Sequence, residues 1–71
     1  MATVFVRLMD EGVEVWAPVP AVALGNGLYR VLPTENYDPE LETWEFVPGV
    51  TVECETRSES GERRLLATRQ V

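Results

Sequence analysis

The stretch Val13–Pro33, VEVWAPVPAVALGNGLYRVLP, decides the fold, because it contains the clearest turn signal in the chain. Two apolar runs flank Asn26-Gly27, and Asn-Gly between such runs is typical of a β-hairpin whose two turn residues both need a positive φ. A turn at these residues places four apolar side chains on one face, as the pairs Leu24–Tyr29 and Val22–Val31. The sequence therefore predicts a hairpin with one side to bury.

Two prolines interrupt the first arm of this hairpin. Pro18 and Pro20 have no N–H to donate to a sheet ladder, and proline within sheets is confined to edges and bulges. We therefore expect two strand pieces joined by a kink or bulge at Ala17–Ala21, which is how small barrels turn corners.

Strand patterns also occur on both sides of the hairpin. Thr3–Met9 is β-branched and apolar on both faces, and Asp10–Gly12 after it is typical of a tight turn. Val50–Arg57 alternates cleanly, and Arg63–Arg69 follows it as the last strand. A four-residue turn, Ser58–Gly61, would join these two strands with the pairs Cys54–Leu65, Val52–Ala67 and Glu55–Arg64, the last of which is an opposite-charge pair on the outer face.

Short strands at regular spacing, with little helical periodicity, are typical of a closed or half-open barrel. We predict that residues 1–71 form a single all-β domain, a small SH3-like barrel of five to six antiparallel strands. At most one helical turn is expected, opened by Pro39 with Asp38 as its cap. A core this small needs bulky side chains, and the candidates are Phe5, Trp44 and Phe46.

The charge balance excludes several classes of partner. Twelve acidic residues and six arginines give a net charge of −6, and the chain has neither lysine nor histidine. A duplex-binding surface needs clustered cations, and anionic membranes repel an acidic protein at long range. We therefore expect neither nucleic acid nor a membrane as partner. A single cysteine cannot form an internal disulfide, which favours a reducing compartment and predicts a cytoplasmic location.

The residues for most catalytic chemistry are also missing. Without histidine the commonest general base and metal ligand is lost, and without lysine only the N-terminus could form a Schiff base. Cys54 alternates with Val52, which points it inward, so we expect a buried structural thiol. Glu35–Glu42 offers oxygens for calcium but has neither the spacing nor the glycine of an EF-hand. The sequence predicts no enzyme, no cofactor and no metal site.

Three strings in the chain carry a resemblance to a known set of proteins. They are D-E-G-x-x-V-W-x-P-V from Asp10, G-N-G-L-Y-R-V from Gly25, and W-E-F-x-P-G-x-x-V-x-C-E from Trp44. In this order they resemble small, uncharacterised bacterial proteins, and the resemblance covers nearly the whole chain. It implies an SH3-like barrel and a bacterial origin, and it brings no assigned activity.

The longest connection, Thr34–Thr43, is the candidate binding surface. It is acidic and carries Tyr37 beside Asp38-Pro39, and SH3-type surfaces use aromatic side chains next to acidic loops to bind proline-rich, basic peptides. Tyr37 is expected to be exposed, whereas Trp16, just before the prolines, fits either core or surface. The candidate protein-binding residues are Trp16, Glu35, Tyr37, Asp38, Glu40 and Glu42.

Two function classes follow from this surface. The first is a small adaptor whose partner is another protein with a basic or proline-rich surface. The second is an acidic inhibitor or nucleic-acid mimic that occupies a basic groove on a target, and its binding would fall steeply with salt. A domain that contacts only copies of itself is a third reading. For assembly, the sequence allows a monomer or a weak homodimer through a sheet edge.

Overall fold

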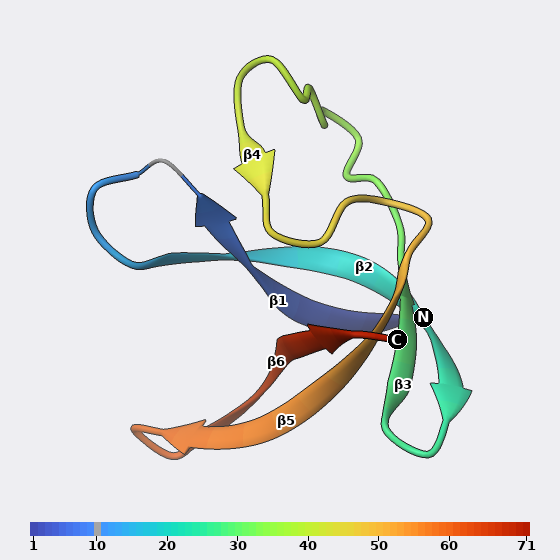
Figure 1. Cartoon of the computed structure of the whole chain (residues 1–71). Helices are drawn as coiled ribbons and strands as arrows, with labels where there is room; N and C mark the ends of the chain where they lie inside the picture. Colours follow the sequence, from blue (N-terminus) through green and yellow to red (C-terminus); the bar gives the residue numbers. More distant parts are fainter. Residues whose placement is uncertain (10) are drawn as a thin grey trace.

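Six strands form a single sheet that curls into a small barrel (Figure 1). The structure is a computed structural model, and it describes residues 1–9 and 11–71, without the side chain of Glu59. The strands are β1 (Ala2–Met9), β2 (Val15–Gly25), β3 (Leu28–Val31), β4 (Thr43–Trp44), β5 (Thr51–Glu59) and β6 (Glu62–Gln70). No helix occurs among the described residues. The predicted all-β, barrel-like fold is therefore confirmed.

The barrel is a ring of five strands closed by a parallel pair. The strand order is β2-β3-β5-β6-β1-β4, and β2 also pairs with β1, so that β4 lies outside the ring on β1. Four of the five contacts in the ring are antiparallel, whereas β1 and β6 run parallel and pair through Phe5 and Leu66. The expectation of antiparallel strands throughout is wrong at this seam. Five strands that alternate in direction end with the first and last running the same way.

The core is filled mainly by small β-branched residues. Five valines are fully buried, and Trp44 and Phe46 join the same cluster, as predicted. The valines are Val4, Val6, Val19, Val31 and Val52. Phe5 was expected in the core but is only half-buried. Because side chains alternate along a strand and both neighbours of Phe5 point inward, Phe5 lies on the outer face.

The hairpin turn is at the predicted residues. Asn26 and Gly27 have φ of +57° and +76°, and Gly25 pairs with Leu28 on either side of them. The predicted pairing is wrong beyond the turn, because the register shifts between Ala23 and Gly25. This bulge slides the strands by one residue, and a one-residue slip exchanges the two faces. The observed pairs are Ala21–Val31, Val22–Arg30 and Ala23–Tyr29, and Val22 and Leu24 are exposed.

The two prolines do not break β2, contrary to the predicted kink at Ala17–Ala21. The strand pairs with β1 without interruption from Val15 to Ala21. The Arg7 carbonyl accepts from the Glu45 N–H at 2.9 Å, so Arg7 turns its backbone polar groups away from β2. On β1, Phe5 is opposite Pro18 and Thr3 is opposite Pro20. Both lie an even number of residues from Arg7, so their backbone polar groups also point away from β2. In an antiparallel ladder the nitrogens of both prolines therefore point away from β1, so the ladder with β1 needs no N–H from them.

The second hairpin has a tighter turn than predicted. The strands run on to Glu59 and Glu62, and only Ser60 and Gly61 form the turn, with φ of +50° and +82°. The register is therefore shifted by two residues, which keeps each side chain on its predicted face. The observed pairs are Cys54–Ala67, Glu55–Leu66, Thr56–Leu65 and Arg57–Arg64, and not the predicted Cys54–Leu65, Val52–Ala67 and Glu55–Arg64. Of the predicted Asp10–Gly12 turn, Asp10 lies outside the described residues, and Gly12 has a φ of +70°.

Replacing Gly27 with valine should destabilise the domain by about 1–3 kcal/mol, because a β-branched residue is strained at a positive φ. A Cβ at Gly27 would meet no atom within 4 Å, so the cost comes from the backbone alone. Urea denaturation followed by tryptophan fluorescence measures the change. As a control, Asn26→Gly should unfold near the wild-type midpoint, since glycine adopts this φ freely. If Gly27→Val also unfolds at the wild-type midpoint, the turn assignment is wrong.

Candidate functional site

The acidic loop, Thr34–Thr43, folds on itself through Asp38. One side-chain oxygen of Asp38 accepts from the Glu40 N–H at 2.9 Å, and its carbonyl accepts from Leu41 and Glu42 at 3.0 and 3.1 Å. These bonds close one turn behind Pro39, with Asp38 as the cap. The structure has a hydrogen-bonded turn here and no helix, which agrees with the expectation of at most one helical turn, and the Asp38 carboxylate has a structural role.

Tyr37 belongs to the packing of this loop and is half-buried, so the expectation that it is exposed is wrong. Its ring packs edge-on against Trp44, with the centroids 4.6 Å apart and the planes at 62°. The Trp44 indole N–H donates to Glu42 at 3.1 Å. Tyr37 and Glu42 thus hold the acidic loop onto the barrel through Trp44, whereas Asp38 bonds within the loop. Of the candidate residues in this loop, only Glu35 and Glu40 are exposed.

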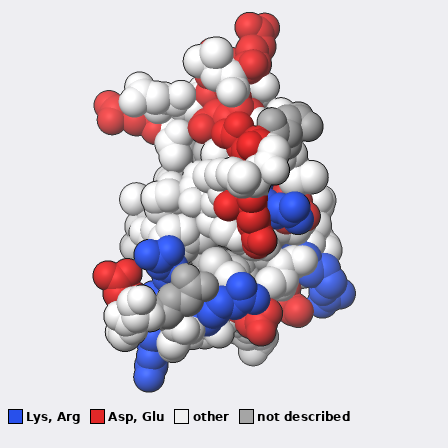
Figure 2. All heavy atoms as spheres, turned by 90° about the vertical axis from the view of Figure 1, so that its left-hand side faces the viewer, with Lys and Arg blue, Asp and Glu red and all other residues white. Residues whose placement is uncertain are grey.

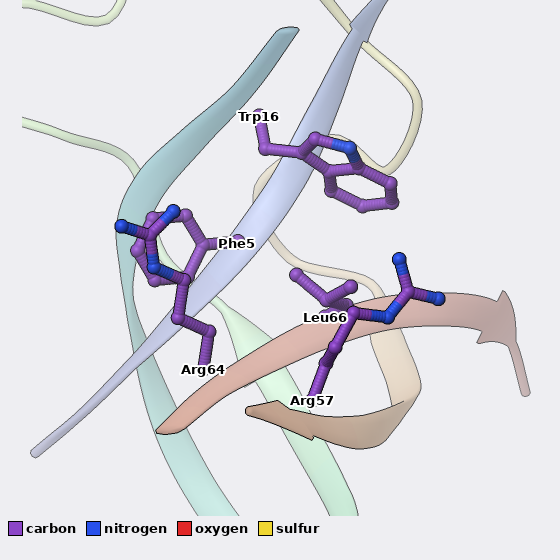
Figure 3. Close-up of a pocket in the computed structure, with 5 residues that line it drawn as sticks. All are labelled: Phe5, Trp16, Arg57, Arg64 and Leu66. Atoms are coloured by element: carbon purple, nitrogen blue, oxygen red, sulfur yellow. The ribbon is translucent and has the colours of Figure 1, made fainter. Parts of the chain in front are cut away.

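Trp16 lies in a different place, on the outside of the barrel. It lines a small hollow together with four other side chains, none of which comes from the acidic loop (Figure 3). We call this hollow, of about 40 Å³, the outer pocket, and its residues are Phe5, Trp16, Arg57, Arg64 and Leu66. The structure therefore separates Trp16 from the other residues predicted to form the site.

Strand register explains why these residues meet. Phe5 points outward from β1 and pairs with Leu66 across the parallel seam. Trp16 is opposite Arg7 and therefore on the same outer face as Phe5, two residues away on β1. Leu66 is only 6% exposed, although it lies on this outer side. The seam is thus lined by apolar side chains outside as well as inside.

Two arginines border the outer pocket and face each other across the hairpin. Arg57 on β5 is directly opposite Arg64 on β6. The Arg64 guanidinium lies over the Phe5 ring, 5.1 Å from its centroid, and contacts Glu62 at 3.4 Å. Arg57 is exposed, and it makes no ion pair with any carboxylate whose side chain the structure describes. Like charges directly opposite on a sheet are unfavourable, so the pairing opposes stability.

Acidic and basic side chains separate on this side of the molecule. Figure 2 shows carboxylates gathered at the upper end of this face, whereas the arginines lie over the lower half together with other carboxylates. The basic half includes the β5–β6 hairpin, which carries Arg57, Arg63 and Arg64. The acidic end includes the loop with Glu35 and Glu40. The acidic loop and the two arginines of the outer pocket thus lie in different halves of this face.

Sequence reasoning missed four of the five residues of the outer pocket. Phe5 carried a usable signal, because an aromatic residue out of phase with Val4 and Val6 must face outward. Leu66 carried a weaker one, since Leu65 and Leu66 cannot both face the core of a regular strand. Nothing in the sequence indicated that Arg57 and Arg64 are opposite, because that depends on the length of the Ser60-Gly61 turn.

No family model, curated protein or solved structure matches the chain. Within residues 1–9 and 11–71, no three histidine, cysteine, aspartate or glutamate side chains are grouped so that they could hold a metal ion. The same residues include no helix long and apolar enough to span a membrane.

Cys54 lies on the inward side of β5 but is half-buried rather than fully buried as predicted. Burial raises the pKa of its thiol from the ordinary value to about 11, because desolvation disfavours the thiolate. The neutral thiol is therefore stabilised by folding. This stabilisation is complete below the ordinary thiol pKa and is lost as the pH rises toward about 11.

Native Cys54 should therefore react slowly with a thiol reagent at neutral pH and faster as the pH is raised toward about 11. In denaturant the same thiol should react quickly at neutral pH, because its pKa returns to the ordinary range. Absorbance with an aromatic disulfide reagent measures both rates. Fast labelling of the native protein at neutral pH would contradict the assignment and reopen a redox role.

Proposed function

We propose that the protein is a non-catalytic, SH3-like interaction domain that binds another protein through the outer pocket. The observation that carries this proposal is the half-buried Trp16 on the outer face, beside an apolar hollow and two arginines. Tryptophan and arginine are the side chains most enriched at the energetic centres of protein interfaces. The bacterial origin and the cytoplasmic location belong to the same proposal, and they rest on the resemblance and on the single cysteine.

The arginine pair supports a binding role over a purely structural one. Phe5, Leu66 and Arg64 have a structural use, because they cover the parallel seam from outside. Trp16 and Arg57 come from β2 and β5, which are not part of that seam. A like-charge pair that opposes folding is the kind of local conflict expected at functional sites.

A basic or proline-rich partner on the acidic loop is the competing version of this proposal. It has less support, because Asp38 and Glu42 are already hydrogen-bonded within the loop and Tyr37 packs on Trp44. The acidic inhibitor or nucleic-acid mimic would use the same loop. It is supported by the carboxylates gathered at that end of the molecule (Figure 2).

A monomer fits this proposal better than a dimer through the edge of β2. Along the outer side of this strand Pro18 and Pro20 offer no N–H, so an added strand would lose two ladder bonds there. The Pro20 carbonyl on that side is already bonded to the Leu32 N–H at 2.9 Å. The first half of β2 is thus protected against strand addition.

Two variants separate these versions of the proposal. Trp16→Gln removes the indole from the outer pocket, whereas Glu35→Gln combined with Glu40→Gln removes the exposed carboxylates of the acidic loop. A partner identified by crosslinking in the native cell should bind Trp16→Gln at least about tenfold more weakly and the double variant with nearly wild-type affinity. Isothermal titration at low and high salt measures both.

Thermal unfolding of each variant controls for loss of fold. Wild-type affinity in Trp16→Gln, together with loss of binding in the carboxylate variant, would assign binding to the acidic loop. In that case a steep dependence on salt would favour the inhibitor or mimic over the adaptor.

A further inference from the structure

The geometry points to the chemistry of the partner: we infer that the outer pocket takes an acidic linear segment with a small apolar anchor. The apolar side chain would enter the hollow between Phe5, Trp16 and Leu66, and a neighbouring carboxylate would pair with Arg57. This inference rests on the proposed function, because it specifies what the proposed interaction site recognises.

The apolar part of the pocket limits the size of the anchor. Its volume of about 40 Å³ exceeds the roughly 10–15 Å³ that a cavity needs to hold one water molecule, so the hollow has room for a small side chain. The branched end of a leucine or valine side chain is the anchor that we assign to this hollow. Leu66 is at the centre of the five side chains in Figure 3, with Phe5 on one side and Trp16 and Arg57 on the other.

Arg57 is the group that selects the charge of the partner. Figure 3 shows its guanidinium on the Trp16 side of the pocket, and the side chain is exposed. A guanidinium presents paired N–H donors that match a carboxylate, and such charge-assisted bonds are stronger than neutral ones. Arg64 already contacts the Phe5 ring and Glu62. It therefore adds positive charge to the site, and we do not assign the pairing with the partner's carboxylate to it.

Arginines bring positive charge to this face, although the chain as a whole is acidic. Three of the six arginines lie on it, since Arg7 is opposite Trp16 and has the same parity as Phe5. Two carboxylates close to these residues are already occupied, Glu14 by the Trp16 indole N–H at 2.8 Å and Glu62 by Arg64. The Glu62 carboxylate therefore repels an incoming anion less than a free one would, whereas Glu14 keeps its full charge because its donor is neutral.

The carboxylate of Glu55, which lies on this face, would weaken the binding of an acidic segment. Glu55 is exposed, pairs with Leu66 and lies two residues before Arg57 on the same face. It would repel an acidic segment that approaches along β5. Glu55→Gln should therefore strengthen binding of the acidic segment by a few-fold.

The two tryptophans provide a built-in comparison for the test. Trp16 lines the outer pocket, whereas Trp44 is 3% exposed and its indole N–H is bonded to Glu42. The two indole N–H signals of the ¹⁵N-labelled full chain therefore report the pocket and the core separately. The probe is the blocked peptide acetyl-Asp-Leu-Glu-amide. Acetyl-Asn-Leu-Gln-amide and acetyl-Lys-Leu-Lys-amide serve as the neutral and basic versions, and inorganic phosphate is a fourth arm.

We expect the acidic peptide to shift the Trp16 signal and to leave the Trp44 signal in place. The neutral peptide should bind about tenfold more weakly, because it loses the charge-assisted bonds to Arg57. Arg57→Gln should reduce affinity for the acidic peptide by the same factor, and Arg57→Lys by an intermediate one. Arg63→Gln is the matched control: it removes the same charge from the other face of the hairpin and should change little.

Several results would overturn the inference. One is equal or tighter binding of the basic peptide, and another is an equal loss in Arg57→Gln and Arg63→Gln, which would mean that only net charge matters. Phosphate that matches the acidic peptide would assign the site to a simple anion without an apolar anchor. A Trp16 signal that no concentration of the acidic peptide moves would also reject it. None of these results would decide the proposed function itself. That proposal is tested separately, by the affinity of the native partner for Trp16→Gln.

Discussion

Closing a ring with an odd number of strands is the constraint on which the rest of this structure depends. The five strands of the ring alternate in direction, so the first and last must meet in parallel. This seam is short, with Phe5 and Leu66 as its only pair among the described residues, whereas β1 and β2 pair over seven residues. Backbone hydrogen bonds alone therefore hold it weakly, and side chains on both sides of the sheet must protect it. Val4, Val6 and Ala67 do this from inside, and Phe5 and Leu66 do it from outside.

The outer pocket follows from this protection. An apolar pair placed outside the barrel needs cover from water, and Arg64 provides part of it by lying over Phe5. The cover is incomplete, which leaves a hollow that Trp16 and Arg57 border from neighbouring strands. The residues that protect the seam from outside therefore also line the hollow on which the proposed function rests. The same logic explains why the acidic loop is less suited to binding. Tyr37 and the Glu42 carboxylate attach it to Trp44, and the Asp38 carboxylate is bonded within the loop.

Sequence patterns were sufficient for the features set by local chemistry. The Asn26-Gly27 turn, the Asp38 cap and the buried Trp44 and Phe46 all follow from residue type and short spacing. Register was not predictable, because bulges and turn length decide it: the shift between Ala23 and Gly25 exposes Val22, and the two-residue turn at Ser60 pairs Arg57 with Arg64. The continuous β2 was missed because proline is tolerated wherever its nitrogen faces away from the partner strand, and that parity depends on the register with β1. The candidate site failed for the same reason, since the outer pocket is assembled from four strands.

The claim that Phe5 and Leu66 meet outside the barrel is tested most directly by nuclear Overhauser effects in the ¹³C- and ¹⁵N-labelled full chain. The account predicts contacts between the ring protons of Phe5 and the methyl groups of Leu66, and none between that ring and the methyl groups of Val19 or Val31. Contacts from the Phe5 ring to these two core valines would contradict it. They would mean that β1 is turned by one residue, with Val4 and Val6 outside and no outer pocket at the seam.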